Sequence, residues 1–381
     1  MRKGWEYKKL GEVATYINGY AFKPDQWKES GTPIVRIQNL NNENAPYNYY
    51  DGEVPDKVKI QNGDLLISWS ASLGAYIWHG GNAFLNQHIF KVAFDKTDID
   101  KFFLKYAVTS KLAAMAEQVH GATMKHIVKK DFDNTQIPYP PLSTQLAIVS
   151  ELDKINELIR LKKEQLKDFD NLAQSLFYEM FGDPVENEMG WEVKKLNDIC
   201  DVRDGTHDSP KYLQNSEYIL ITSKNIVNGS IDFENVNYIS EEDYIKINKR
   251  SKVDNGDIIM PMIGTIGKPI IAHIDETHKF CIKNVALIKF LADSTVSNMF
   301  IVNLMRCSSF SSYLLNQNKG GTQKFVALGA IRKLPIPLPP LSLQRLFAQR
   351  IEQIEREKSE VQKSIQDLET LLASRMQYWF E

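Results

Sequence analysis

The stretch Ile137-Pro-Tyr-Pro-Pro-Leu-Ser143 occurs a second time in this 381-residue chain, as Ile336-Pro-Leu-Pro-Pro-Leu-Ser342. The second copy lies 199 positions after the first, since 336 minus 137 is 199. Each copy follows a related segment at that same spacing, Gly121-Ala-Thr123-Met-Lys125 and Gly320-Gly-Thr322-Gln-Lys324. An ungapped repeat over this length indicates that the chain is a tandem duplication.

The repeat continues toward the N-terminus at shorter spacings. Asn62-Gly-Asp64 is matched by Asn255-Gly-Asp257, and 255 minus 62 is 193. Trp5 is matched by Trp191, and 191 minus 5 is 186. Two insertions in loops, of 193 − 186 = 7 and 199 − 193 = 6 residues, reconcile the halves, and loops are where insertions are tolerated.

Composition allows two domains and excludes several classes of protein. The 43% of apolar residues is enough for two cores, and no apolar run reaches the roughly 18 to 20 residues that span a bilayer. The start of the chain lacks the apolar stretch of a secretory signal, so we expect a cytoplasmic protein that does not enter a membrane. A net charge of −2 gives no general attraction to polyanions, so any site for a polyanion must be a local patch.

The three cysteines, Cys200, Cys281 and Cys307, have no paired spacing of a disulfide framework or a zinc site. We expect them to be thiols of the core.

The sequence of each half of the chain predicts an α+β domain. Short β-type runs occur at 32–37, 63–69, 75–78 and 88–94, and again at 218–222, 256–260, 268–272 and 285–290. Helical stretches are expected near 99–119 and 298–315. The fold class is therefore α+β, with two tandem-duplicated mixed domains.

Each proline cluster leads into a long helix with an apolar heptad pattern. We divide the chain into domain 1–140, helix 141–182, linker 183–190, domain 191–335 and helix 336–381. The predicted seam residues are Leu152, Ile155, Ile159, Leu166, Phe169, Leu176, Ile351, Ile354, Val361, Ile365, Leu368 and Leu372. Lys162 and Lys358 are polar intruders in this seam.

A helix of about 40 residues is roughly 60 Å long, more than a small domain covers. We therefore expect the two helices to pair as an antiparallel coiled coil that joins the domains. The alternative is that each helix packs only on its own domain.

No catalytic constellation is present in the sequence. Gly264-Thr-Ile-Gly267-Lys268 resembles a phosphate loop, but Met262 replaces its first Gly and Pro269 replaces its Ser or Thr. His273 and His278 lack the spacing and the third ligand of a zinc site. We predict no catalytic residue, no metal site and no cofactor in this chain.

Polar segments follow matching strands in the two halves. Arginine, asparagine and glutamine can each read a base by paired hydrogen bonds in the major groove. These segments supply the predicted DNA-reading residues Arg36, Gln38, Asn39, Asn41 and Asn42 in the first half, and Thr222, Ser223, Lys224 and Asn225 in the second. The alternative is a pair of hydrophilic loops whose amides cap the backbone.

Basic residues before the proline clusters are candidates for phosphate contacts. They are Lys125, His126 and Lys129 in the first half and Lys319 and Lys324 in the second, with ordinary solvated charge as the alternative. The two halves keep their framework residues but differ in the loops, Arg36 standing where Thr222 stands. This suggests two different ligands of one kind.

Over its whole length the sequence resembles the specificity subunit of type I restriction-modification systems. The residues that carry the resemblance are Trp5-x-x-Lys8-Lys9-Leu10-Gly11-Glu12-Val13, the Asn62-Gly-Asp64 element, the segment from Ile137 to Gln145, and Asp204-Gly-Thr-His207-Asp-Ser-Pro-Lys211-Tyr. The resemblance implies two target recognition domains that read a bipartite, asymmetric site in double-stranded DNA. It adds Lys23, His207 and Lys211 as DNA contacts.

The resemblance also implies partners that do the chemistry. Methyltransferase (modification) subunits would carry S-adenosylmethionine, and restriction subunits would carry ATP, Mg and a translocating nuclease. Two other classes stay open at this point: a two-headed protein adaptor that does not bind DNA, and a duplicated hydrolase.

Overall fold

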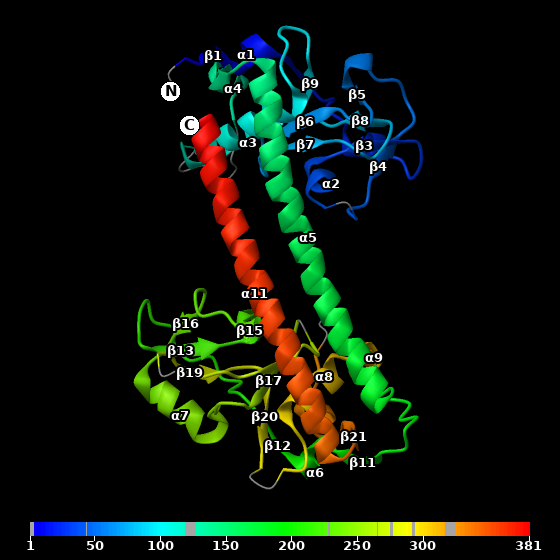
Figure 1. Cartoon of the computed structure of the whole chain (residues 1–381), viewed down its shortest axis with the longest axis vertical. Coiled ribbons are helices and arrows are strands. Elements are labelled where there is room, and N and C mark those ends of the chain that lie inside the picture. Colours follow the sequence, from blue (N-terminus) through cyan, green and yellow to red (C-terminus); the bar gives the residue numbers. More distant parts are fainter. Residues whose placement is uncertain are drawn as a thin grey trace. The chain divides into compact units, whose positions relative to one another are not determined.

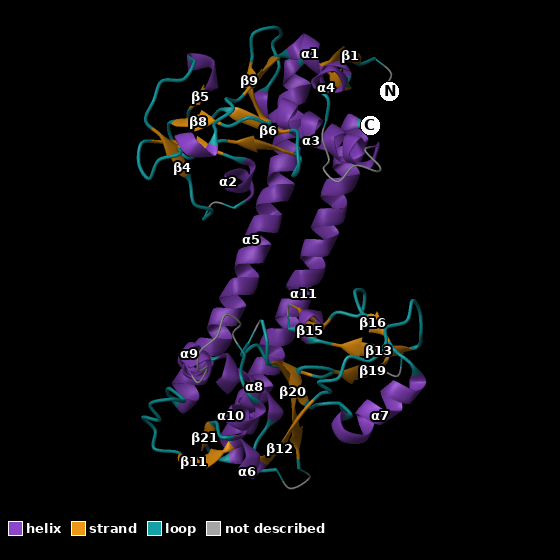
Figure 2. Ribbon diagram, turned by 180° about the vertical axis from the view of Figure 1, so that it is seen from behind, coloured by secondary structure: helices purple, strands orange, loops and turns teal. Residues whose placement is uncertain are grey.

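The computed structural model of the chain describes residues 4–42, 44–118, 127–227, 229–264, 266–274, 277–291, 294–316 and 325–381. It separates into two compact units, the first made of Met1–Lys163 with Lys363–Glu381 and the second of Glu164–Gln362. Two helices of 40 residues, α5 (Leu142–Phe181) and α11 (Leu341–Phe380), each contribute one end to each unit (Figures 1 and 2). No helix among these residues is both long and apolar enough to cross a bilayer.

The first unit holds two four-stranded sheets and a two-stranded one, with strand orders β2-β9-β6-β7, β4-β3-β8-β5 and β1-β10. Besides α5, its elements are β1 (Glu6–Lys9), α1 (Leu10–Val13), β2 (Thr15–Asn18), η1 (Pro24–Gln26), β3 (Thr32–Val35), α2 (Ile37–Asn41), β4 (Asn48–Tyr50), η2 (Asp56–Val58), β5 (Lys59–Ile60), β6 (Leu65–Ser68), β7 (Gly74–Ile77), β8 (Ala83–Leu85), β9 (Ile89–Ala93), α3 (Lys101–Gln118), α4 (Lys129–Asn134) and β10 (Gln136–Tyr139).

The second unit repeats this plan in sheets ordered β12-β20-β17-β18, β16-β13-β19 and β11-β21, with a small β14-β15 hairpin added. Besides α11, its elements are β11 (Glu192–Lys195), α6 (Leu196–Ile199), β12 (Cys200–Asp204), β13 (Tyr218–Ile221), η3 (Ser223–Asn225), β14 (Ile226–Val227), β15 (Ser230–Ile231), β16 (Asn237–Tyr238), α7 (Glu241–Ser251), β17 (Ile258–Pro261), β18 (Ile270–Ile271), β19 (Lys279–Ile282), β20 (Val285–Phe290), α8 (Asn298–Arg306), α9 (Ser308–Asn316), α10 (Leu328–Arg332) and β21 (Pro335–Leu338).

The strand registers confirm the duplication. Glu6 pairs with Tyr139, and Glu192, 186 positions later, pairs with Leu338, 199 positions after Tyr139. In both units one strand pair is parallel, β3 with β8 and β13 with β19, among otherwise antiparallel neighbours. The predicted strands are present, and the α+β fold class is confirmed.

The first insertion builds a helix, and the last helical region of the second unit is divided in two. The first unit has only the short turn η2 before its β5 strand, whereas the second has the 11-residue helix α7 in the corresponding place. The single helix predicted near 298–315 is two, α8 and α9, because Cys307 between them has an extended ψ of 138° and leaves the helical path.

A buried glutamine explains the repeated motif after each proline cluster. Gln145 accepts a hydrogen bond from the Asp100 backbone N–H at 2.9 Å and donates to the Pro140 carbonyl at 2.9 Å. Gln344 repeats both bonds, with Ser297 and Pro339. Both side chains are almost fully buried, so each amide ties the start of a long helix to the start of α3 or α8.

In the first unit, the beginning of α5 packs against the end of α11. Glu151 accepts hydrogen bonds from Arg375 at 3.1 Å and from the Trp379 indole at 3.1 Å, and Lys163 pairs with Glu369 at 2.8 Å. Rising numbers on one helix thus meet falling numbers on the other, so this segment is antiparallel.

In the second unit, the end of α5 packs against the beginning of α11 with the same polarity. Phe181 lies 5.2 Å from Phe347 and 4.9 Å from Phe300 of α8, measured between ring centroids. Phe177 joins this aromatic cluster, 5.6 Å from Phe347. Truncating one such ring to alanine typically costs about 3–5 kcal/mol, so the cluster is a main anchor of both helices.

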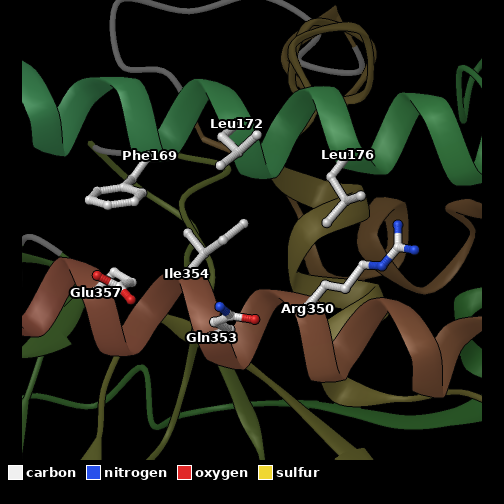
Figure 3. A pocket seen from close by; sticks show the side chains of 7 residues that line it. All are labelled: Phe169, Leu172, Leu176, Arg350, Gln353, Ile354 and Glu357. Carbon is white, nitrogen blue, oxygen red and sulfur yellow. The ribbon is translucent and has the colours of Figure 1, made fainter.

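The predicted seam residues are all buried or half-buried. In the second unit, Phe169, Leu172 and Leu176 of α5 face Ile354 of α11 across a cavity of about 290 Å³, with polar side chains of α11 at its rim (Figure 3). The pattern from sequence did not include the aromatic cluster, because its rings face the core of the unit rather than the partner helix alone.

Lys358 is a partly buried lysine in the seam, so its replacement compares an ion pair with apolar burial. Its side chain is 17% exposed and its Nζ lies 2.7 Å from Oδ1 of Asp170, which is itself 67% exposed. Nζ also lies 3.2 Å from Oε1 of Glu355, which is exposed too. We expect Lys358→Leu to raise the free energy of unfolding by about 1 kcal/mol, because burying a Leu side chain outweighs ion pairs with two exposed partners.

Chemical denaturation of the purified chain measures this difference. Lys363→Leu, on an exposed position of the same helix, is the matched control and should change stability by less than about 0.5 kcal/mol. A clear loss of stability in Lys358→Leu would show that the ion pair outweighs apolar burial.

Candidate nucleic-acid interface

The polar segment after β3 contains a short helix, α2 (Figure 1). Arg36 is the residue directly before this helix. Asn39 is 4% exposed. Its Oδ1 accepts from the Arg36 backbone N–H at 3.0 Å, and its Nδ2 donates to the Ala45 carbonyl at 3.1 Å. This amide closes the loop on itself.

Asn225 does the same in the second unit. It is 3% exposed, its Oδ1 accepts from the Thr222 backbone N–H at 3.0 Å, and its Nδ2 donates to the Asn235 carbonyl at 2.9 Å. For Asn39 and Asn225 the prediction of base readout is therefore corrected: the alternative of capping amides describes them, because their polar groups are already used inside the loop.

The other polar residues of these segments stay accessible. Gln38, Asn41 and Asn42 are exposed, and Arg36 is half-buried. Asn41 Oδ1 accepts from the Tyr76 hydroxyl at 2.7 Å. In the second unit Lys224 is exposed and Ser223 half-buried, whereas the Thr222 hydroxyl donates to Asn225 at 3.0 Å.

Backbone hydrogen bonds bring three segments of each unit side by side. In the first unit Tyr20 N–H donates to Leu85 O at 2.8 Å, and Asn86 N–H donates to Val35 O at 3.1 Å, next to Arg36. In the second, Thr206 N–H donates to Ile282 O at 3.0 Å and Lys283 N–H to Ile221 O at 2.9 Å. The segments that start at Gly19 and Gly205 thus lie near the segments after β3 and β13.

Gly19 and Gly205 are required at these crossings. A Cβ atom on Gly19 would lie 2.1 Å from the Asn86 carbonyl oxygen, and one on Gly205 would lie 2.3 Å from the Ile282 carbonyl oxygen. Only glycine allows the two backbones to approach this closely.

His207 lies in the second of these segments and is held between two acceptors. Its Nδ1 is 3.0 Å from Asn284 Oδ1, and its Nε2 is 2.7 Å from Oδ2 of Asp204, a buried carboxylate that Arg250 also contacts. Only a doubly protonated ring donates to both. The hydrogen bonds to Asn284, then Asp204, accordingly raise the pKa of His207 above its ordinary value.

Sequence analysis missed the groups that frame His207. Lys283 is 9% exposed, and its Nζ lies 2.5 Å from the Ser209 hydroxyl. Asn284 adopts a φ of 55°, in the left-handed region that asparagine tolerates. The Lys-Asn pair directly before the β-type run at 285–290 was the available signal.

The remaining predicted contacts differ in their surroundings. Lys23 and Lys211 are exposed. Lys129 is paired with Asp133 at 2.9 Å and lies 5.4 Å from the centre of the Phe90 ring, so its charge is partly neutralised. Lys125, His126, Lys319 and Lys324 lie outside the described residues.

The described residues offer no group of three or more His, Cys, Asp or Glu that could hold a metal ion. The three cysteines are buried, as expected, and burial raises the pKa of each thiol to about 12. Thiols of that kind are not nucleophiles near neutral pH.

Comparison with known proteins places the chain in one protein family. The model of the type I restriction modification DNA specificity domain matches residues 2–168 and 188–370. The chain is 25% identical to the type I restriction enzyme MjaVIII specificity subunit of Methanocaldococcus jannaschii, over 97% of this chain and 92% of the relative. It is 22% identical to the EcoBI specificity subunit of Escherichia coli, over 95% and 81%.

Solved structures show the same fold. A specificity subunit from M. genitalium aligns with a TM-score of 0.52 at 13% identity, over 99% of this chain and 96% of that one. A chain from a study of the assembly and conformational transition of the type I system aligns with a TM-score of 0.58 at 17% identity, over 99% and 97%.

The protonation of His207 predicts a small dependence of stability on pH. The pKa of His207 is higher in the folded than in the unfolded protein, so protonation of the ring stabilises the fold. This stabilisation is complete below the unfolded pKa of about 6.5 and is lost as the pH rises through the folded pKa. We expect the wild type to exceed His207→Gln in unfolding free energy by more at pH 5.5 than at pH 8.5. The difference should stay below about 1 kcal/mol because the side chain is more than half exposed.

Chemical denaturation at the two pH values measures the effect, and NMR titration of the ring gives its pKa directly. A difference between the two proteins that is independent of pH would contradict the proposed protonation.

Proposed function

Because the chain belongs to the type I restriction-modification DNA specificity family, we propose that each of its two units reads one half of a bipartite, asymmetric DNA target. A specificity subunit selects DNA while modification and restriction subunits carry out the chemistry. The predicted non-catalytic role is thus confirmed. Because the chain belongs to a DNA-specificity family, the protein-adaptor and hydrolase alternatives no longer apply. We place the complex in the cytoplasm.

The observation that carries the proposal is a common loop frame with different exposed groups. Asn39 and Asn225 close equivalent loops with equivalent hydrogen bonds. On that frame the first unit presents Arg36, Gln38 and Asn41, whereas the second presents Ser223 and Lys224. Side chains of different hydrogen-bonding character select different bases, so the two half-sites differ.

We infer that the accessible predicted residues form the DNA-facing surface of each unit. In the first unit these are Lys23, Arg36, Gln38, Asn41 and Asn42; in the second, His207, Lys211, Ser223 and Lys224. His207 supports this surface indirectly, because both ring nitrogens are engaged within the protein. We retain 1–140 and 191–335 as the two reading segments and take the long helices to set the gap between half-sites.

Exchange of one reading segment tests the proposal. A chain whose residues 1–140 are replaced by those of a relative with another target, assembled with its modification subunits, should methylate a sequence altered in one half only. Sequencing of a methylated random DNA pool gives the result. The reciprocal exchange of 191–335 is the matched control and should alter only the other half.

Changes in both halves after a single exchange would contradict independent reading. A methylated sequence unchanged by either exchange would place DNA recognition elsewhere in the complex.

The near-neutral charge predicts weak DNA binding by the isolated chain. Phosphate contacts dominate most protein–DNA affinity, and a net charge of −2 supplies little general attraction. We expect the affinity for target DNA to rise at least about tenfold when modification subunits are added at one fixed salt concentration, as measured by fluorescence anisotropy. Equally tight binding by the isolated chain would reject this expectation.

A further inference from the structure

The guanidinium group of Arg36 is held in place from two sides. Its central carbon lies 5.0 Å from the centre of the Trp27 ring, and its Nη1 donates to Asn48 Oδ1 at 3.1 Å. Arg36 also stands at a fixed point of the backbone, where β3 ends and α2 begins. An arginine side chain normally samples many rotamers, so these contacts order it before any ligand arrives.

Trp27 is a firm support for this group. Its ring packs on a cluster of buried side chains that includes Phe22, Ile34 and Phe84. Asn48 belongs to β4, which pairs with β3 in register, so it too is fixed by the sheet. Both supports of the guanidinium are therefore held by the fold of the first unit, Trp27 by the core cluster and Asn48 by the sheet.

One edge of the guanidinium remains unused. Asn48 occupies Nη1, and the described residues provide no acceptor for Nε and Nη2. These two atoms carry parallel N–H groups along one edge of the planar guanidinium. Guanine presents two acceptors, O6 and N7, on its major-groove edge at the spacing that such a pair of donors fits.

A phosphate also accepts paired hydrogen bonds from arginine, but the surroundings favour a base. Between residues 32 and 50 Arg36 is the one cation, and its neighbours include the amide residues Gln38 and Asn41. Phosphate contacts come from many side-chain types and carry no sequence information, whereas paired bonds from arginine to guanine, and from asparagine or glutamine to adenine, are the usual contacts to base edges in the major groove.

The second unit provides an internal comparison. Thr222 stands 186 positions after Arg36, and its hydroxyl donates to Asn225 within the loop. The same place in the frame thus carries a neutral group that is already satisfied. At this position of the loop, the first unit carries a paired donor and the second does not.

We propose that Arg36 reads a guanine in the half-site bound by the first unit, with Trp27 and Asn48 as the positioning residues that aim its free edge. This rests on the proposed function, namely that the first unit binds DNA. It adds the class of base and the residue that selects it.

The test uses the complex of this chain with its modification subunits and a random DNA pool read by methylation sequencing. In Arg36→Ala, one G·C position of one half-site should lose roughly tenfold or more of its discrimination, as expected for loss of a paired arginine–guanine contact. All other positions should stay unchanged. Arg36→Lys keeps the charge but not the planar, oriented pair of donors, so it should lose most of that discrimination.

Lys28→Ala is the matched control. Lys28 is an exposed cation beside Trp27, and its bond to the Tyr49 carbonyl comes from the backbone, so the substitution leaves that bond intact. We expect its methylated sequence to match the wild type. Trp27→Leu and Asn48→Ala should lose part of the discrimination at the same single position, and Trp27→Phe, which restores a ring, should regain it.

The outcomes separate the two proposals. An unchanged sequence in Arg36→Ala and Arg36→Lys overturns the guanine assignment and leaves the proposed function intact. Uniform weakening over all sequences in Arg36→Ala, with a shallower dependence on salt, marks a phosphate contact and also overturns it. A wild-type complex with no sequence preference would remove the proposed function itself.

Discussion

A helix of 40 residues with apolar side chains along one side exposes more apolar surface than its own small sheets can cover. In this chain each such helix is covered partly by the end of the other. The first unit needs Phe380 of α11, whose ring lies 5.3 Å from Phe103, and the second needs Phe177 and Phe181 of α5. The first unit combines two separate stretches of sequence, and the second, although contiguous, begins within α5, so each core closes only with a helix end that belongs to the other repeat.

That constraint explains which features the two repeats share. Gln145 and Gln344 fix the start of each long helix, and the strand registers at β1-β10 and β11-β21 are the same. A change at any of these places would move a helix that the other unit also uses. The loops after β3 and β13 are under no such demand beyond their capping amides, so their exposed side chains can differ.

The chemistry of the chain is consistent with a reader rather than a catalyst. Asp204, for example, is a buried carboxylate that is fully engaged within the protein, by Arg250 and His207. Arg36 differs, since it is ordered on two sides and free on the third. A group prepared in this way loses little conformational entropy when it meets a ligand, which favours discrimination between similar sequences.

The sequence by itself determined the duplication, the α+β class, most strands, both long helices and the apolar seam, because those features depend on local periodicity and on spacings that survive divergence. Only the tertiary structure decided which polar residues are available. From the sequence, Asn39 and Asn225 are expected to be exposed amides, but in the fold the carbonyl groups of Ala45 and Asn235 accept their hydrogen bonds. Trp27 and Asn48 contact Arg36 only because the sheet is folded. Burial and orientation depend on contacts between residues distant in sequence, and no local pattern carries that information.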